Sequence, residues 1–182
     1  MFPHTIKIVG FHNANCMKHN NILAIDEGNE YSGYCVLDSE TYEPLKFCKI
    51  DNNELLDMIP ELKETWNISE LAIERIESYG MAVGKSVFDT CVWAGRFIER
   101  CNRLGIPYEW VTRKEEKMMI CQSMKANDST IRRALIDMFA KHDFKNGKGT
   151  KKNRDFFYGF KADVWSAFAI GYVYIGRRKL ND

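Results

Sequence analysis

Two short apolar segments, each followed directly by an acidic residue, restrict the fold of this chain more than any other feature. Residues 22–25 (ILAI) end at Asp26, and residues 71–73 (LAI) end at Glu74. An apolar run without polar alternation is typical of a strand that is buried on both faces of a sheet. Strands alternate with helical patterns in the second half of the chain, which predicts an α/β sheet whose central strands are parallel.

The rest of the pattern predicts a meander of strands followed by alternating helices and strands. Two further strands, at 31–37 and 45–50, follow the first one after short turns and extend it into an antiparallel meander. Pro60 lies within the first predicted helix and is expected to bend or split it. The other predicted elements are helices at 54–66, 83–104, 114–123, 129–141 and 162–175, and a strand at 106–111.

Length and composition exclude several classes of protein. The 182 residues suit one domain, and 45% apolar with 28% charged residues is typical of a folded globular protein. A net charge of +1 excludes binding of nucleic acid through bulk positive charge. No apolar run approaches the roughly 18 residues of a membrane span. The six cysteines lack zinc-like or C-x-x-C spacing, so we expect reduced thiols and a cytoplasmic location.

The first residues of the chain do not resemble the rest. Residues 1–16 lack a charged segment followed by an apolar one, so they do not read as a signal peptide. We expect residues 1–16 to be an N-terminal extension of unknown role. Residues 17–182 are then expected to form a single domain.

Three acidic residues are the candidates for chemistry. If the strands ending at Asp26 and Glu74 are neighbours, their carboxylates lie side by side at the carboxyl edge of the sheet, where reacting groups gather. Adjacent like charges need a cation, and oxygen ligands favour Mg²⁺ or Mn²⁺. A third acid, Asp163, lies in the first turn of the last predicted helix. Each acid also has a structural reading, as a strand end in solvent or as a partner of the helix dipole.

These segments carry a family resemblance. Residues 22–28 (ILAIDEG), 71–74 (LAIE) and 162–167 (ADVWSA) together resemble the RuvC-type Holliday junction resolvases of the ribonuclease H-like superfamily, above all the bacteriophage forms. The resemblance runs from about residue 21 to residue 175. It implies an α/β fold with a mixed five-stranded sheet, three antiparallel strands then parallel strands, flanked by helices.

The resemblance also implies an activity. It points to a homodimeric endonuclease that nicks four-way junctions and other branched DNA through a metal-activated water, with Mg²⁺ as cofactor and Mn²⁺ able to substitute. No small-molecule cofactor or membrane is implied, and a phage-encoded protein would act in the cytoplasm of its bacterial host. Asp26, Glu74 and Asp163 fall on three of the family's four catalytic, metal-binding acids. The fourth corresponds to Ser166, and Glu77 is either its replacement or a surface acid.

Basic and aromatic residues near these motifs are the candidates for DNA binding. Residues 145–154 form a basic loop that either contacts phosphates or is merely solvated, and Gly147 and Gly149 are expected to keep it mobile. Arg113 is a candidate for a basic residue that relatives carry near the site, with Lys114 and Lys117 as alternatives. The residues predicted to bind DNA are Tyr79, Lys85, Arg113, Lys148, Lys151, Lys152 and Arg154.

Other interpretations remain open on the sequence. The helix at 83–104 is apolar around more than one face, so it forms either a dimer interface or a layer within one domain. Another enzyme of the same fold remains an alternative, either an RNA-processing nuclease or a phosphotransferase of the sugar-kinase and actin-like group, which also begins with D-x-G on its first strand. Ser166 in place of an acid also keeps open a protein that binds branched DNA without cutting it.

Overall fold

A five-stranded mixed sheet forms the centre of the molecule, whose computed structural model describes residues 20–78, 80 and 82–181. The strand order is β3-β2-β1-β4-β5. The first three strands pair antiparallel, and β1, β4 and β5 pair parallel, which confirms the predicted fold class. The strands are β1 (Asn21–Asp26), β2 (Tyr31–Asp38), β3 (Pro44–Asp51), β4 (Ile68–Arg75) and β5 (Tyr108–Thr112).

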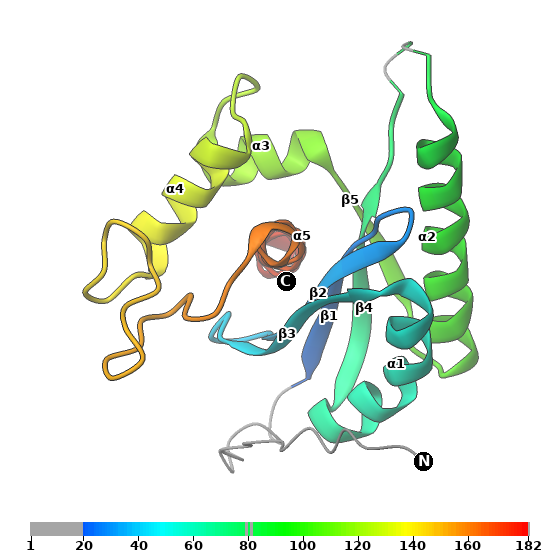
Figure 1. Cartoon of the computed structure of the whole chain (residues 1–182), viewed down its shortest axis with the longest axis horizontal. Coiled ribbons are helices and arrows are strands. Elements are labelled where there is room, and N and C mark those ends of the chain that lie inside the picture. Colours follow the sequence, from blue (N-terminus) through cyan, green and yellow to red (C-terminus); the bar gives the residue numbers. More distant parts are fainter. Residues whose placement is uncertain (1–19, 79, 81, 182) are drawn as a thin grey trace.

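Helices cover both faces of this sheet (Figure 1). On one face lie α1 (Asn52–Trp66) and α2 (Lys85–Arg103). On the other face α5 (Ala162–Asn181) packs against β1 and β2, with α3 (Arg113–Cys121) and α4 (Asp128–Phe139) beyond it. No helix in the described part of the chain is long and apolar enough to cross a membrane.

The two apolar segments of the sequence form the centre of the core. In β1, Ile22 and Ala24 face α5, while Leu23 and Ile25 face the other layer, and all four are fully buried. Both faces of the strand are therefore covered, which is why its sequence shows no polar alternation. The same holds for residues 71–73 of β4.

Pro60 does not split α1, which was one of the two expected outcomes, and a distant side chain bonds the carbonyl that the proline leaves without its usual donor. The helix is continuous from Asn52 to Trp66. Proline has no N–H to donate to the carbonyl four residues earlier, here that of Leu56. Arg100 of α2 donates its Nε–H to this oxygen at 3.2 Å. The carbonyl is therefore satisfied across the interface between the two helices.

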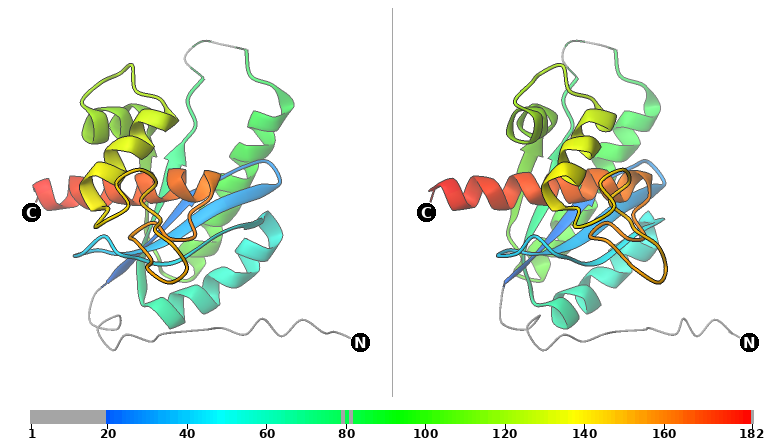
Figure 2. Two further views of the ribbon diagram at one scale, coloured as in Figure 1. Left: turned by 60° about the vertical axis from the view of Figure 1, so that its left-hand side comes forward. Right: turned by 90° about the vertical axis from the view of Figure 1, so that its left-hand side faces the viewer.

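The basic loop between α4 and α5 has a specific conformation. Gly147 and Gly149 have φ values of 71° and 65°, in the left-handed region that favours glycine. A Cβ at Gly147 would lie 2.8 Å from the ring of Phe157, which is fully buried. Gly147 thus lets the loop pack against the core, and the mobility expected of the loop stays a prediction. Figure 2 shows this loop (yellow to orange) beside α4 and the first turns of α5.

Candidate active site

The register of the sheet brings the first two predicted acids together. Strands β1 and β4 pair in parallel, with Ile25 opposite Ile73. Asp26 and Glu74 each follow these residues by one position, so both carboxylates lie at the same edge of the sheet. The two strands are therefore neighbours, as the expected side-by-side placement of Asp26 and Glu74 requires.

Asp163 reaches the same place from α5 because a glycine lets the helix approach the sheet. Gly33 of β2 pairs with Asp26. A Cβ on Gly33 would lie 2.4 Å from the backbone oxygen of Asp163. Any larger residue would push the first turn of α5 away from the strand. Gly33 is thus the residue of the sequence that permits this contact. Its role can be recognised only when the pairing of β2 with β1 is known.

Electrostatics show how tightly the acids are grouped. Burial, and after it the nearby charges of Glu74, Asp163 and Glu116, raise the pKa of Asp26 to about 8. A hydrogen bond from the side chain of Ser166 opposes this rise only in part. Burial likewise raises the pKa of Glu74. The group is therefore short of positive charge.

Two acids in this group were not predicted from the sequence. Glu116 of α3 is only 1% exposed, and burial together with the charge of Glu74 raises its pKa to about 7 against the opposing effect of Arg113. Glu27 follows Asp26 and is 7% exposed. Burial, with the charges of Glu74 and Asp26, raises its pKa to about 9. Glu116 lies in the first turn of a helix and Glu27 in a turn after a strand. Acidic residues are common at both kinds of position on protein surfaces, so the sequence did not indicate that these two are buried.

The donor set fits a hard divalent cation. Carboxylate oxygens are the ligands that Mg²⁺ and Mn²⁺ prefer. Both oxygens of Glu27 are buried without a hydrogen-bond partner within the described residues. Unpaired buried oxygens beside other carboxylates are costly without a cation.

The site is nevertheless not preassembled. No three His, Cys, Asp or Glu side chains in the described part of the chain are grouped so that they could ligate one ion as they stand. One reason is visible at Asp163, whose Oδ2 lies 2.5 Å from Nζ of Lys49 on β3. An ammonium group therefore already neutralises one of the three predicted acids, and ion binding requires side-chain rearrangement.

The remaining predicted acid lies outside this group. Glu77 is exposed, three residues beyond Glu74, past the end of β4. Ser166 lies one helical turn after Asp163 and hydrogen-bonds Asp26. The buried residue Glu116, rather than Glu77, is the additional carboxylate closest in environment to the predicted three.

The predicted DNA-binding residues fall into different surroundings. Arg113 is paired with Glu116 and Asp128, so its guanidinium is already engaged. Lys85 at the start of α2 is highly exposed and pairs with Asp89. Tyr79 lies outside the described residues.

The basic loop carries the other predicted contacts. Lys151 and Lys152 are exposed at its tip, Lys148 is half-buried, and Arg154 lies over the ring of Tyr158. The carboxylate of Asp155 accepts backbone N–H groups from residues 141–143 and 156. These bonds hold the pKa of Asp155 well below its usual range, although burial alone would raise it.

Comparison with solved structures shows which known folds this architecture resembles. No protein-family model matches the sequence, and no curated protein matches it. The structure of Thermus thermophilus RuvC in complex with a Holliday junction substrate matches with a TM-score of 0.70 at 11% identity, over 90% of this chain and 97% of that one. A second T. thermophilus RuvC structure gives 0.68 at 11% identity, over 88% and 96%.

A eukaryotic resolvase shows the same fold at lower similarity. The yeast mitochondrial Holliday junction resolvase Ydc2 matches with a TM-score of 0.54 at 13% identity, over 86% of this chain and 78% of that one. The chain therefore has the ribonuclease H-like fold of the RuvC-type Holliday junction resolvases.

Proposed function

We propose that this protein is a divalent-metal-dependent, structure-selective endonuclease that nicks four-way junctions and other branched DNA. The observation that carries the proposal is the grouping of Asp26, Glu74 and Asp163 at one edge of a RuvC-type sheet. Structural similarity supports a junction-resolving nuclease. The grouped acids support metal-dependent hydrolysis.

Asp26, Glu74 and Asp163 would hold the metal, with Mg²⁺ expected and Mn²⁺ able to substitute. When bound, the metal supplies activation of water and stabilisation of the leaving oxygen. Two further residues of the chain position the acids that would hold the metal. Gly33 sets the distance between α5 and the sheet, and Ser166 holds the carboxylate of Asp26.

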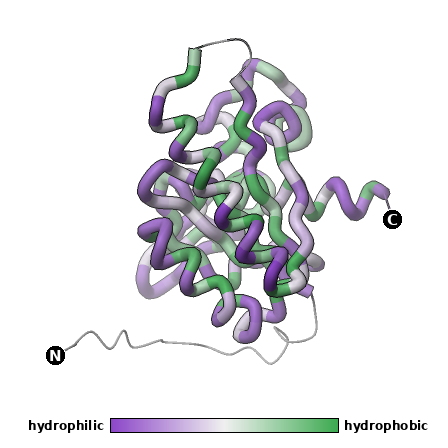
Figure 3. Tube along the Cα trace, turned by 90° about the vertical axis from the view of Figure 1, so that its right-hand side faces the viewer, coloured by the Kyte–Doolittle hydropathy of each residue, from purple (hydrophilic) through white to green (hydrophobic). Residues whose placement is uncertain are grey.

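A dimer interface on α2 is part of the proposal. Phe88 and Val92 are one helical turn apart, and they are 60% and 62% exposed. Large apolar side chains exposed together on one helix favour burial against a partner. Figure 3 views this side of the molecule, where hydrophobic segments (green) recur between hydrophilic ones along the helices. We propose that a second copy of the chain covers this face, because two-fold pairing would present two sites to a symmetric junction.

A cleavage assay tests the function. The full-length protein is incubated with a labelled four-way DNA junction, linear duplex DNA of the same sequence or a structured RNA, each in Mg²⁺, Mn²⁺ or EDTA. We expect paired nicks in the junction with either metal and none in EDTA. Cleavage of RNA in preference to the junction would contradict the DNA assignment.

A protein that binds branched DNA without cutting it is the second candidate. Two observations favour it: Ser166 at the position of a fourth acid, and a carboxylate group that is not preassembled for an ion. If tight junction binding persists while neither metal supports cleavage at protein excess, this second function replaces the first.

A further inference from the structure

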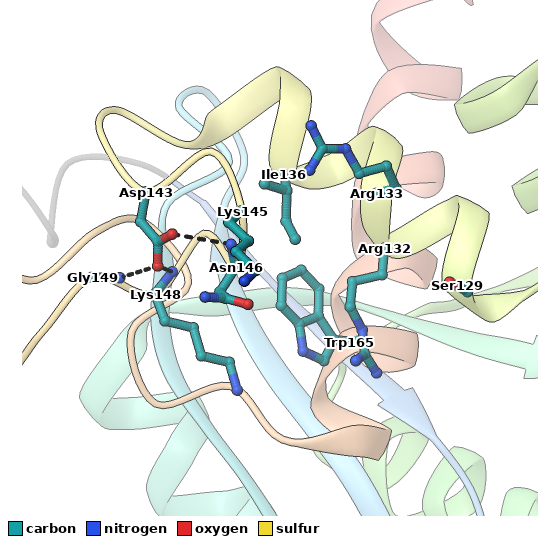
Figure 4. Close-up of a pocket in the computed structure, with 10 residues that line it drawn as sticks. All are labelled: Ser129, Arg132, Arg133, Ile136, Asp143, Lys145, Asn146, Lys148, Gly149 and Trp165. Carbon is teal, nitrogen blue, oxygen red and sulfur yellow. Dashed lines mark hydrogen bonds between the residues drawn. The ribbon is translucent and has the colours of Figure 1, made fainter.

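A basic cavity lies beside the acidic group, between α4, residues 142–149 and the start of α5. Its volume is about 440 Å³, within the range of about 300–1,000 Å³ that is typical of ligand pockets. Figure 4 shows the side chains that form its wall. The cationic ones that carry the argument are Arg132, Lys145 and Lys148.

These three cations have no carboxylate partner within the described residues. Arg132 lies over the ring of Trp165, 5.2 Å from its centroid, and no ion pair of Lys145 or Lys148 is found there. Arg133, on the same wall, differs because it pairs with Asp137 and donates to the carbonyl of Phe144. Arg133 therefore holds the loop to α4, while the other three charges remain available to a ligand.

The carboxylate in this wall does not neutralise the three cations. Asp143 accepts backbone N–H groups from Asn146, Lys148 and Gly149 at 2.9–3.2 Å. The carboxylate oxygens of Asp143 thus bind the loop's own backbone, and these bonds hold the loop around the cavity (Figure 4). The cavity is left with a surplus of positive charge and a defined shape.

Trp165 gives the cavity a flat wall with a donor. Its ring lies between Asn146 and Arg132 in Figure 4, and the residue is 5% exposed. Its indole N–H has no acceptor among the residues that the structure describes. This nitrogen is not one of the fully buried unpaired polar atoms of the described residues, so its N–H is accessible from the cavity. A ligand that brings acceptor oxygens to this wall would supply the missing acceptor.

The same wall connects the cavity with the acidic group. Arg132 and Trp165 also line a second cavity of about 130 Å³, which extends to Asp163 and Ser166. A strand whose phosphodiester lies at the acids therefore has adjacent space leading into the basic cavity. Asp128 also lines this second cavity, and it pairs with Arg113, the guanidinium that Glu116 binds as well.

We propose that this cavity binds a backbone phosphate and its adjoining unpaired nucleotide, on the DNA strand that flanks the cleavage site. Three cations match a phosphodiester, and the volume admits more than a phosphate group alone. The inference rests on the proposed function, since it assigns the cavity to the strand that enters the acidic site. It links the cavity to branched DNA, because a strand that leaves the duplex can lay an unpaired nucleotide into this open pocket.

Binding of a four-way junction in EDTA tests the cavity apart from cleavage. Fluorescence anisotropy is measured over a series of salt concentrations for the wild type, Arg132→Ala and the double variant Lys145→Ala/Lys148→Ala. Lys151→Ala/Lys152→Ala is the comparison, because it removes the same charge from the same loop outside the cavity wall. These two lysines are themselves predicted to contact DNA, so this variant is compared by the position of the lost contact and not by its overall affinity. We expect each cavity variant to bind the junction at least about fivefold more weakly than the wild type, with a salt slope lower by at most about one, because the cavity contacts a single backbone phosphate.

Neutral methylphosphonates at single positions of the junction then locate the contact. In the wild type, one position within a few nucleotides of the branch point should weaken binding most. The Lys145→Ala/Lys148→Ala variant should lose this penalty, and the Lys151→Ala/Lys152→Ala control should keep it. An equal penalty in the wild type and the cavity variant would overturn the inference.

The outcomes separate the two proposals. If the wild type shows the position-specific penalty but never cleaves in Mg²⁺ or Mn²⁺, the nuclease proposal fails and the cavity remains. If the wild type cleaves while the cavity variants bind the junction as tightly as the wild type does, the cavity inference fails and the nuclease proposal stands. Thermal melting of each variant verifies that it is folded.

Discussion

Lys49 of β3 places its ammonium nitrogen 2.5 Å from a carboxylate oxygen of Asp163 on α5. The sheet register accounts for this contact, since Lys49 pairs with Gly33, which in turn pairs with Asp26. The hydrogen bond to Asp163 raises the pKa of Lys49, so the ammonium stays charged at neutral pH. A lysine thus occupies the place of a counter-cation beside the proposed metal ligands.

Substituting Lys49 is expected to tighten metal binding. Lys49→Met removes a positive charge that competes for Asp163, and a half-exposed pair of this kind contributes about 1 kcal/mol, or about fivefold in affinity. Calorimetric titration of the DNA-free protein with Mn²⁺ measures the change. Lys46→Met is the matched control, because Lys46 lies on the same strand with its side chain on the opposite face. Weaker Mn²⁺ binding by Lys49→Met would show that the lysine does not compete.

Removal of either strand-end acid is expected to abolish cleavage and spare binding. Asp26→Asn and Glu74→Gln keep the shape of each side chain but remove an anionic metal ligand. Junction cleavage in Mg²⁺ should fall by at least about a hundredfold, while junction affinity in EDTA stays within about twofold. Glu77→Gln tests the exposed acid three residues away and should retain activity. A fully active Asp26→Asn protein would remove Asp26 from the site.

Asp26 is also expected to make metal-free stability depend on pH. Its pKa rises from 3.8 to about 8 on folding, through burial first and then through the neighbouring carboxylates. The contribution of Asp26 to the unfolding free energy is then fully present below about pH 4 and is lost as the pH rises through about 8. In EDTA, Asp26→Asn should therefore melt about 4–8 °C above the wild type at pH 8, equivalent to about 2 kcal/mol, and show a smaller gain at pH 5. A gain of equal size at both pH values would exclude ionisation as its cause.

The buried pair of Arg113 and Glu116 is expected to be strongly coupled. Arg113→Met leaves Glu116 charged or protonated in a buried position beside Glu74, which should cost about 3 kcal/mol of unfolding free energy. Adding Glu116→Gln should recover more than half of this loss, as measured by urea denaturation. Asp128→Asn removes the highly exposed partner of the same guanidinium and should cost under about 1 kcal/mol. Additive losses in the double variant would contradict the coupling.

The exposed face of α2 is expected to mediate self-association. Phe88→Asp places a charge at the centre of this face, so a dimer should dissociate to a monomer in light scattering coupled to size exclusion. Phe144→Asp is the control, since Phe144 is exposed to a similar degree on the loop after α4. A wild-type protein that is monomeric at all concentrations would contradict the proposed dimer.

The sequence by itself determined the order of the elements and the location of the first two acids. Strands β1 and β4 have short apolar sequences because both of their faces are covered, and Asp26 and Glu74 follow directly at the carboxyl ends of these apolar segments. The amphipathic pattern of α2 and the apolar sequence of α5 are likewise local properties. Such features are readable because hydrophobic burial leaves a periodic trace along the chain.

Only the tertiary structure decided what surrounds those acids. Lys49, Glu116 and Gly33 have ordinary local contexts, and their roles arise from strand register and from the approach of α5 and α3. Pro60 is tolerated within α1 because Arg100, on another helix, satisfies the carbonyl that proline leaves free. Charge pairing and hydrogen-bond replacement join residues far apart in sequence, and no local pattern records such pairs.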